Sequence, residues 1–244
     1  MILLKTVGFI LAAFLLYGLF LFACSLFVNP KKEYENHSRF YRGLLNGVTA
    51  LAMRVMRIRI HVSGVEQVPP DTKNLLFVSN HRSNFDPIIT WHVFKKWQPS
   101  FVSKASNFRI PIFGRLIRKC CFMAIDRENP RNALRTIVKA AGLLRKGEVS
   151  VGVYPEGTRS KEGKLLPFHN GVFKMAQKAE SAIVVLSVVG TECIHKNYPF
   201  HHTDVYLDVL DVIPAQTVKA TKTDALGEQI RAALEARLAK KQEE

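Results

Sequence analysis

Residues 6–29 carry no charged side chain and are almost all apolar. As a helix, these 24 residues would be about 36 Å long, which is enough to cross the hydrocarbon core of a bilayer. The segment has no polar face, so it does not suit the core of a soluble protein, and it is too long for the core of a signal peptide. We therefore predict a membrane anchor, which either spans the bilayer or dips into one leaflet.

The charges beside the anchor predict its orientation. One basic residue, Lys5, precedes it, and four follow it closely: Lys31, Lys32, Arg39 and Arg42. Because positive charge is retained on the cytoplasmic side, a spanning helix would leave the rest of the chain in the cytoplasm. Apolar side chains recur at helical spacing up to Met56, which predicts a second helix on the same membrane face. We assign the anchor and this helix to residues 1–56, and a globular domain to residues 57–244.

The formal net charge of +15 calls for an anionic partner such as nucleic acid, anionic lipid or a phosphorylated substrate. Residues 87–125 contain no acidic side chain, and basic residues are interleaved there with bulky apolar ones. This mixture is typical of a segment that rests on anionic lipid. No recognised nucleic-acid motif is present, so we favour a phospholipid membrane over nucleic acid as the partner.

Strand-like and helix-like segments alternate in the globular domain. The expected strands are residues 57–62, 75–79, 100–105, 120–125, 149–154, 183–189 and 205–213. The expected helices are residues 88–96, 131–145, 171–179 and 224–239. Alternation of this kind predicts an α/β domain with a mostly parallel central sheet flanked by helices.

The run from Asn80 to Pro87 lies between an apolar strand and an apolar helix. We predict Asp86 as the N-cap of that helix and Pro87 as its first residue. A tight turn allows the Asp86 carboxylate to fold back onto His81, which would leave the second imidazole nitrogen free to take a proton from an alcohol. The spacing alone leaves another interpretation open, in which Asp86 is only a cap and His81 only a turn residue.

A second polar stretch, residues 153–160, also follows a β-like run. Gly157 permits a sharp backbone turn, and Thr158 supplies a hydroxyl. Arg159 supplies a planar fork that matches phosphate. The alternative is a surface turn in which Glu156 and Arg159 form a weak ion pair. The glycine spacing excludes a P-loop.

Metal and redox chemistry have less support in the sequence. Three histidines, His195, His201 and His202, lie in a polar loop, but no fourth ligand has a clear spacing. The cysteines show no metal or redox pattern, and the neighbouring Cys120 and Cys121 are expected to be reduced and buried. We therefore expect no metal and no resident cofactor.

Four blocks occur in order along the chain: N-H-x4-D at residues 80–86, R-I-P-I-F-G with I-D-R at 109–114 and 125–127, Y-P-E-G-T-R-S at 154–160, and F-H-N-G at 168–171. Together they resemble the motifs of the 1-acyl-sn-glycerol-3-phosphate acyltransferase family of glycerolipid acyltransferases, with Tyr154 in place of a phenylalanine. Four blocks in the right order are far more specific than any one of them.

The resemblance implies a membrane-bound enzyme that transfers a fatty acyl group from acyl-CoA or acyl carrier protein to the free hydroxyl of lysophosphatidic acid, giving phosphatidic acid. It implies His81 as the general base and Asp86 as the residue that orients it, with backbone N–H groups near the turn stabilising the oxyanion. The residues implied near the acceptor phosphate are Glu156, Gly157, Thr158, Arg159, Arg109 and Lys104. The expected location is the bacterial inner membrane, with the catalytic domain on the cytoplasmic face.

One block departs from the family pattern. The family's last block usually carries two prolines, and both are absent from residues 182–191. Because that block is thought to shape the donor or acceptor pocket, another lysophospholipid or a related lipid remains an alternative acceptor. A hydrolase of the same lipids or thioesters, with Ser79 or Ser83 as nucleophile, and a non-catalytic lipid-binding protein are the other two alternatives.

Overall fold

The computed structural model describes residues 1–126, 129–160 and 162–243. In this part of the chain, seven strands form one sheet in the order β1-β7-β6-β2-β5-β3-β4. The strands are β1 (Ile58–Ser63), β2 (Leu75–Ser79), β3 (Pro99–Lys104), β4 (Met123–Ile125), β5 (Ser150–Val153), β6 (Ala182–Val189) and β7 (Thr203–Ile213). Strands β2 to β6 run parallel, while β7 is antiparallel to β6 and β1 is parallel to β7. The prediction of a mostly parallel α/β sheet is confirmed.

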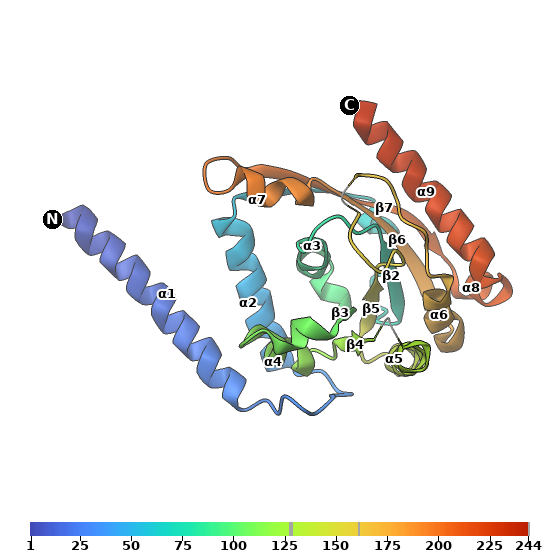
Figure 1. Ribbon diagram of the computed structural model, residues 1–244, viewed down its shortest axis with the longest axis horizontal. Coiled ribbons are helices and arrows are strands. Elements are labelled where there is room, and N and C mark those ends of the chain that lie inside the picture. Colours follow the sequence, from blue (N-terminus) through green and yellow to red (C-terminus); the bar gives the residue numbers. More distant parts are fainter. Residues whose placement is uncertain (127–128, 161, 244) are drawn as a thin grey trace.

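Helices cover both faces of this sheet (Figure 1). One face carries α5 (Pro130–Arg145), α6 (Lys174–Ala179), α8 (Ala215–Ala220) and α9 (Thr223–Glu243). The other carries α2 (Arg39–Val55), α3 (Asp86–Val93) and α4 (Phe113–Lys119), and the short α7 (Ile194–Asn197) precedes β7. A hydrophobic core lies on each face of the sheet, and β2 contributes side chains to both because successive side chains of a strand point to opposite faces. Leu76 and Val78 pack into one core, and Leu75 and Phe77 pack into the other. This explains why β2 is an unbroken apolar run.

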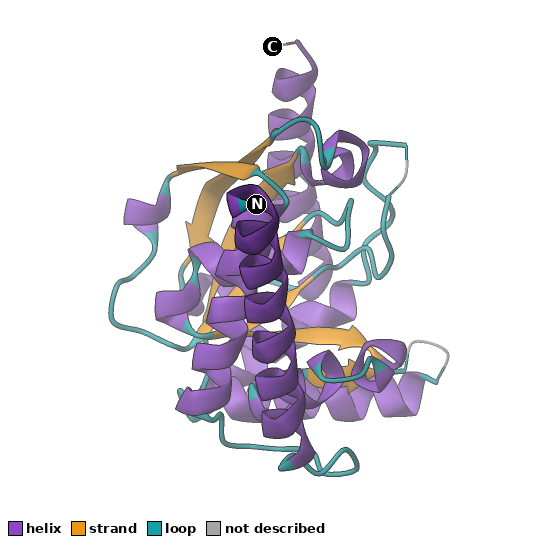
Figure 2. Ribbon diagram, turned by 90° about the vertical axis from the view of Figure 1, so that its left-hand side faces the viewer, coloured by secondary structure: helices purple, strands orange, loops and turns teal. Residues whose placement is uncertain are grey.

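The N-terminal helix α1 (Ile2–Leu26) stands away from the domain, with its N-terminus toward the viewer in Figure 2. It is long and apolar enough to cross a membrane, and most of its large side chains are exposed. Among the described residues, the hydrogen bonds between this helix and the domain are made by its last turn. The Tyr41 hydroxyl donates to the Cys24 carbonyl oxygen at 2.9 Å, and Arg115 Nη1 donates to that of Ser25 at 3.2 Å. The helix is therefore available for membrane association.

The predicted second helix exists as α2, but it packs against the α/β domain and is not only a membrane-face helix. Tyr41, Leu45 and Met53 are buried in the cores that include the sheet and α3. The buried Arg42 guanidinium donates to the carbonyl oxygens of Pro99 and Cys120 and to the hydroxyl of Ser100, over distances of 3.0 to 3.3 Å. The division at residues 56 and 57 stays a prediction, but it separates α2 from the domain that α2 contacts.

The segment predicted to rest on lipid contributes mainly to the core. Phe108, Leu116 and Ile117 are buried against α2, because η3 (Ala105–Arg109) and α4 turn their apolar sides inward. The strand predicted from residue 120 begins only at Met123, since the two preceding cysteines form the turn that ends α4. Both of these thiols are free and buried as predicted, and burial raises the pKa of each to about 12.

Replacing Arg42 with methionine is expected to lower the free energy of unfolding by about 3 kcal/mol, because buried acceptors lose a charged donor. The substitution also removes the guanidinium that lies 4.6 Å from the centroid of the Trp91 ring. The measurement is thermal or denaturant unfolding in detergent. The matched control is Arg39→Met on the exposed side of the same helix, and an equal loss in both variants would contradict the role given to Arg42.

Candidate active site

The centre of the site is the turn that follows β2, at the carboxyl end of the parallel strands. Asn80 is fully buried, and its side-chain amide makes two hydrogen bonds to the backbone of Val188 in β6. Asn80 Nδ2 donates to the Val188 carbonyl oxygen and Asn80 Oδ1 accepts from the Val188 N–H, both at 2.8 Å. These bonds hold the start of the turn against β6.

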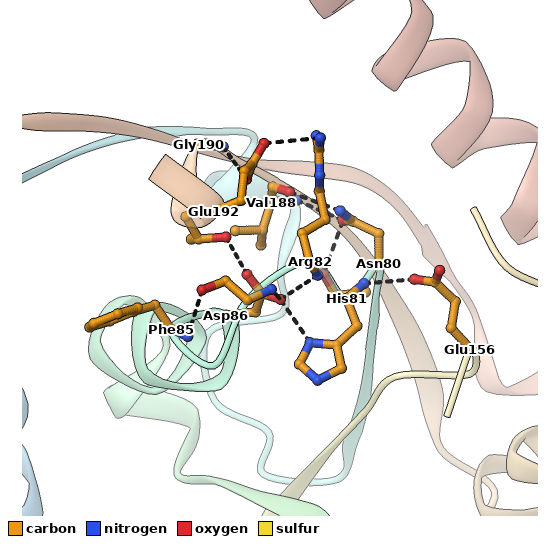
Figure 3. Close-up of polar contacts among 12 residues, drawn as sticks. Asn80, His81, Arg82, Phe85, Asp86, Glu156, Val188, Gly190 and Glu192 are labelled. Carbon is orange, nitrogen blue, oxygen red and sulfur yellow. Dashed lines mark hydrogen bonds and ion pairs between the residues drawn. The ribbon is translucent and has the colours of Figure 1, made fainter. Parts of the chain in front are cut away.

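His81 and Asp86 meet as predicted, with 2.7 Å between His81 Nδ1 and Asp86 Oδ2 (Figure 3). The same oxygen accepts the backbone N–H groups of Arg82 and Ser83, each at 2.7 Å. The other oxygen, Oδ1, accepts from the Thr191 hydroxyl beyond the end of β6. Four donors from two turns therefore hold one fully buried carboxylate.

The prediction that Asp86 is an N-cap is wrong. The α3 helix begins at Asp86 itself and its N-cap is Phe85, while Pro87 lies within the first helical turn. The Asp86 carboxylate points back along the chain to the residues before it. It closes the turn and does not cap the helix.

The His81 ring is held on one side and open on the other. Its side chain is 16% exposed, and it stacks on Tyr154 with 4.3 Å between the ring centroids and 22° between the planes. When Nδ1 donates to Asp86, the neutral ring keeps Nε2 as an acceptor. Nε2 points away from Asp86 (Figure 3). This arrangement is the geometry of a general base.

Glu156, predicted near the acceptor phosphate, does not have free oxygens. Its carboxylate is buried, and Oε1 accepts from the His81 N–H at 2.7 Å while Oε2 accepts from the Leu166 N–H at 2.8 Å. Burial raises the pKa of Glu156. A buried acid that already accepts two backbone amides braces the His81 turn, and its charge would repel a phosphate.

The rest of that stretch is accessible beside His81. Gly157 has φ of +70°, and a Cβ there would come within 3.0 Å of the His169 ring, so the turn needs glycine. Thr158 and Arg159 are exposed, and Ser160 returns to donate its N–H to the His81 carbonyl oxygen at 2.8 Å. The loop is thus attached to the His81 turn at both ends, with its hydroxyl and guanidinium facing solvent.

The two predicted helpers are exposed at the same edge of the sheet. Lys104 ends β3 and Arg109 ends η3. Among the described residues, no hydrogen bond or ion pair joins either cation to residues 157–159. Arg127, part of one of the resembling blocks, and Lys161 lie outside the described residues.

Several site residues were missed by sequence reasoning. Thr191 holds Asp86, and Glu192 forms an ion pair with Arg82 at 3.0 Å while accepting the Gly190 N–H at 3.1 Å (Figure 3). A signal was available, because polar residues follow the buried strand β6 just as they follow β2 and β5. Tyr154 was noted only as a substitution, and its role as a stacking partner was missed.

The other predicted reactive groups do not join the site. The Ser83 hydroxyl accepts from the Phe85 N–H, and the Ser79 hydroxyl donates to Asn80 Oδ1. Neither is bonded to His81. Within the described residues, no group of three histidine, cysteine or acidic side chains is arranged to hold a metal ion. An apolar pocket of about 170 Å³ lies beside Tyr154, and its lining includes Val102, Val153 and Val172.

Comparison with known proteins gives one family. Residues 59–189 match the family model described as Acyltransferase. A 1-acyl-sn-glycerol-3-phosphate acyltransferase of Chlamydomonas reinhardtii is 31% identical over 65% of this chain and 47% of its own length. Proteins with the same description from Escherichia coli K12 and Borreliella burgdorferi are 29% and 28% identical, over 68% and 79% of this chain and 67% and 78% of their own lengths. The chain spans about half or less of the first relatives it matches.

The fold is also that of a solved structure. It is the 1-acyl-sn-glycerophosphate (LPA) acyltransferase PlsC of Thermotoga maritima, with a TM-score of 0.69 and 22% identity. The match covers 98% of this chain and 95% of that one.

Replacing Glu156 with alanine is expected to lower the free energy of unfolding by about 3 kcal/mol, because two backbone N–H groups lose their acceptor. Unfolding in detergent measures this loss, and Glu66→Ala, an exposed acid on the short helix after β1, is the control. Unchanged stability with a raised KM for the acceptor would instead support the predicted phosphate contact.

Proposed function

The chain belongs to the Acyltransferase family, and from this we propose that it transfers a fatty acyl group to the free hydroxyl of lysophosphatidic acid, giving phosphatidic acid. The names of its curated relatives support this choice of reaction. The observation that carries the proposal is the buried Asp86 carboxylate held at 2.7 Å from His81 Nδ1, with Nε2 left as an acceptor.

His81 acts as the general base. Nε2 takes the proton of the acceptor hydroxyl as its oxygen attacks the thioester carbonyl of the donor. The tetrahedral intermediate collapses, the C–S bond breaks, and the proton on Nε2 goes to the leaving thiolate. Asp86 orients the ring and stabilises the imidazolium that forms between these steps.

The oxyanion needs donors other than those expected at the turn. Four backbone N–H groups there already have acceptors: those of His81, Arg82, Ser83 and Phe85. We infer that the intermediate is stabilised by other groups at this edge of the sheet or by donors freed when substrate binds.

The acceptor phosphate binds at the loop of Gly157, Thr158 and Arg159. An arginine can hold phosphate oxygens with two parallel hydrogen bonds, and a glycine lets the ligand approach the backbone closely. Lys104 and Arg109 add positive charge at the same edge. Glu156 supports this loop from behind and is not a phosphate ligand in the proposal.

The acyl donor is acyl-CoA or acyl carrier protein, as a substrate and not as a resident cofactor. The apolar pocket beside Tyr154 suits part of the acyl chain, because its lining is mostly apolar and it adjoins the ring that stacks on His81. Another lysophospholipid as acceptor is the alternative, and an assay with a panel of lysolipids distinguishes the two.

The enzyme works at a membrane through α1. Support comes from a helix that is long and apolar enough to span the bilayer and from the basic residues that follow it. By the rule that positive charge is retained inside, the proposed site is the cytoplasmic face of a bacterial inner membrane.

Replacing His81 with alanine is expected to lower acyl transfer by about 10²–10⁴-fold or more, because positioned general-base catalysis is lost. Thiol release from acyl-CoA is measured with and without lysophosphatidic acid, and folding is checked by unfolding in detergent. His61→Ala, an exposed histidine on β1, is the control. Substantial turnover in the His81 variant would refute the base, and release without acceptor would indicate hydrolysis.

Replacing Arg159 with alanine is expected to raise the KM for lysophosphatidic acid by about 10- to 100-fold, the loss of a charge-assisted hydrogen bond. The KM for the donor should change little. Arg131→Ala, an exposed arginine on α5, controls for the loss of one positive charge. An acceptor KM equal to that of the control would exclude phosphate binding by Arg159.

A further inference from the structure

We propose that the loop of residues 198–202, between α7 and β7, is a second membrane contact that inserts an aromatic side chain into an anionic bilayer surface. The proposal rests on the membrane association proposed for α1. Phe200 is 80% exposed at the tip of this loop, and Tyr198 is 40% exposed. A phenylalanine left in water on a loop has no packing role, whereas the same side chain gains free energy at a lipid surface.

Hydrogen bonds to the rest of the protein fix the backbone of the loop, while the Phe200 side chain is exposed. Arg57 Nη1 donates to the carbonyl oxygens of Pro199 at 3.2 Å and Phe200 at 2.9 Å. The His201 N–H donates to the Asn197 carbonyl oxygen at 2.8 Å. Because these polar groups already have partners within the protein, the tip can enter the headgroup region without leaving them unsatisfied.

The charges around the tip match an anionic surface. Residues 193–202 contain no acidic side chain. Lys196 on α7 and Arg57 and Arg59 beside the loop are exposed. The nearest acid on β7, Asp204, is paired with two histidines. Its Oδ1 lies 2.8 Å from His61 Nε2, and its Oδ2 lies 3.3 Å from His202 Nε2. An exposed aromatic surrounded by basic residues is typical of a contact with anionic lipid.

The position of the loop suits a second attachment point. It lies at the C-terminal end of α2, whereas α1 joins the domain near the N-terminal end of α2, and α1 projects toward the side on which the loop lies (Figure 1). The 17 residues of α2 separate the two points by about 26 Å. Two contacts this far apart would restrict the tilt of the domain on the bilayer, which one helix cannot do.

A tryptophan placed at the tip tests the contact directly. The full-length Phe200→Trp variant is reconstituted in nanodiscs of phosphatidylglycerol and phosphatidylcholine with brominated acyl chains. We expect a blue shift of the added emission and its quenching by bromine, above the background of the two native tryptophans, which are buried. Val138→Trp, an exposed position on α5 on the other face of the sheet, is the control and should stay unquenched.

The outcomes separate this proposal from the membrane association of α1. Failure to co-elute with nanodiscs would overturn both. Co-elution with tip emission no more quenched than the control would leave α1 as an anchor and overturn the loop contact. Equal quenching in pure phosphatidylcholine discs would overturn the assignment to anionic lipid. A blue shift in lipid-free detergent that rises with protein concentration would assign the tip to a second copy of the chain, and would also overturn the proposal.

Discussion

The site depends on one buried carboxylate that accepts four hydrogen bonds. Asp86 joins the imidazole of its own turn, two backbone amides and the Thr191 hydroxyl beyond β6. A buried charge is tolerated only when its acceptors are filled, so the turn after β2 has little freedom to rearrange. The position of the His81 ring follows from this constraint, because its Nδ1 is one of the four donors.

The sheet order explains why so many segments reach the same point. Strands β6, β2 and β5 are neighbours and run parallel, so the turns that follow them leave the same edge of the sheet. Asn80 fastens the first turn to β6, and Glu156 fastens it to the turn after β5. Asp86 and Glu156 therefore support the His81 turn. The imidazole Nε2 and the loop of residues 157–159 remain accessible beside it.

The second helix, α2, is coupled to the same site. The Trp91 indole on α3 donates to Asn46 Oδ1 on α2 at 2.7 Å, and α3 begins at Asp86. Arg42 ties α2 to β3. The sequence prediction treated α2 as part of an anchor because its apolar spacing suits either a membrane surface or a protein core. Periodicity reports that one face is apolar and does not report what covers it.

The sequence by itself determined the class of fold and the long apolar helix, because these follow from hydrophobic pattern. The spacing of His81 and Asp86 made their pairing possible, and only the resemblance to the acyltransferase motifs favoured it. Only the tertiary structure decided that Glu156 is a brace, that Thr191 and Glu192 complete the site, and that α2 belongs to the core. Those roles arise from contacts between residues 57 to 110 positions apart, which depend on the order of strands in the sheet. The order of the strands cannot be predicted from the local sequence pattern.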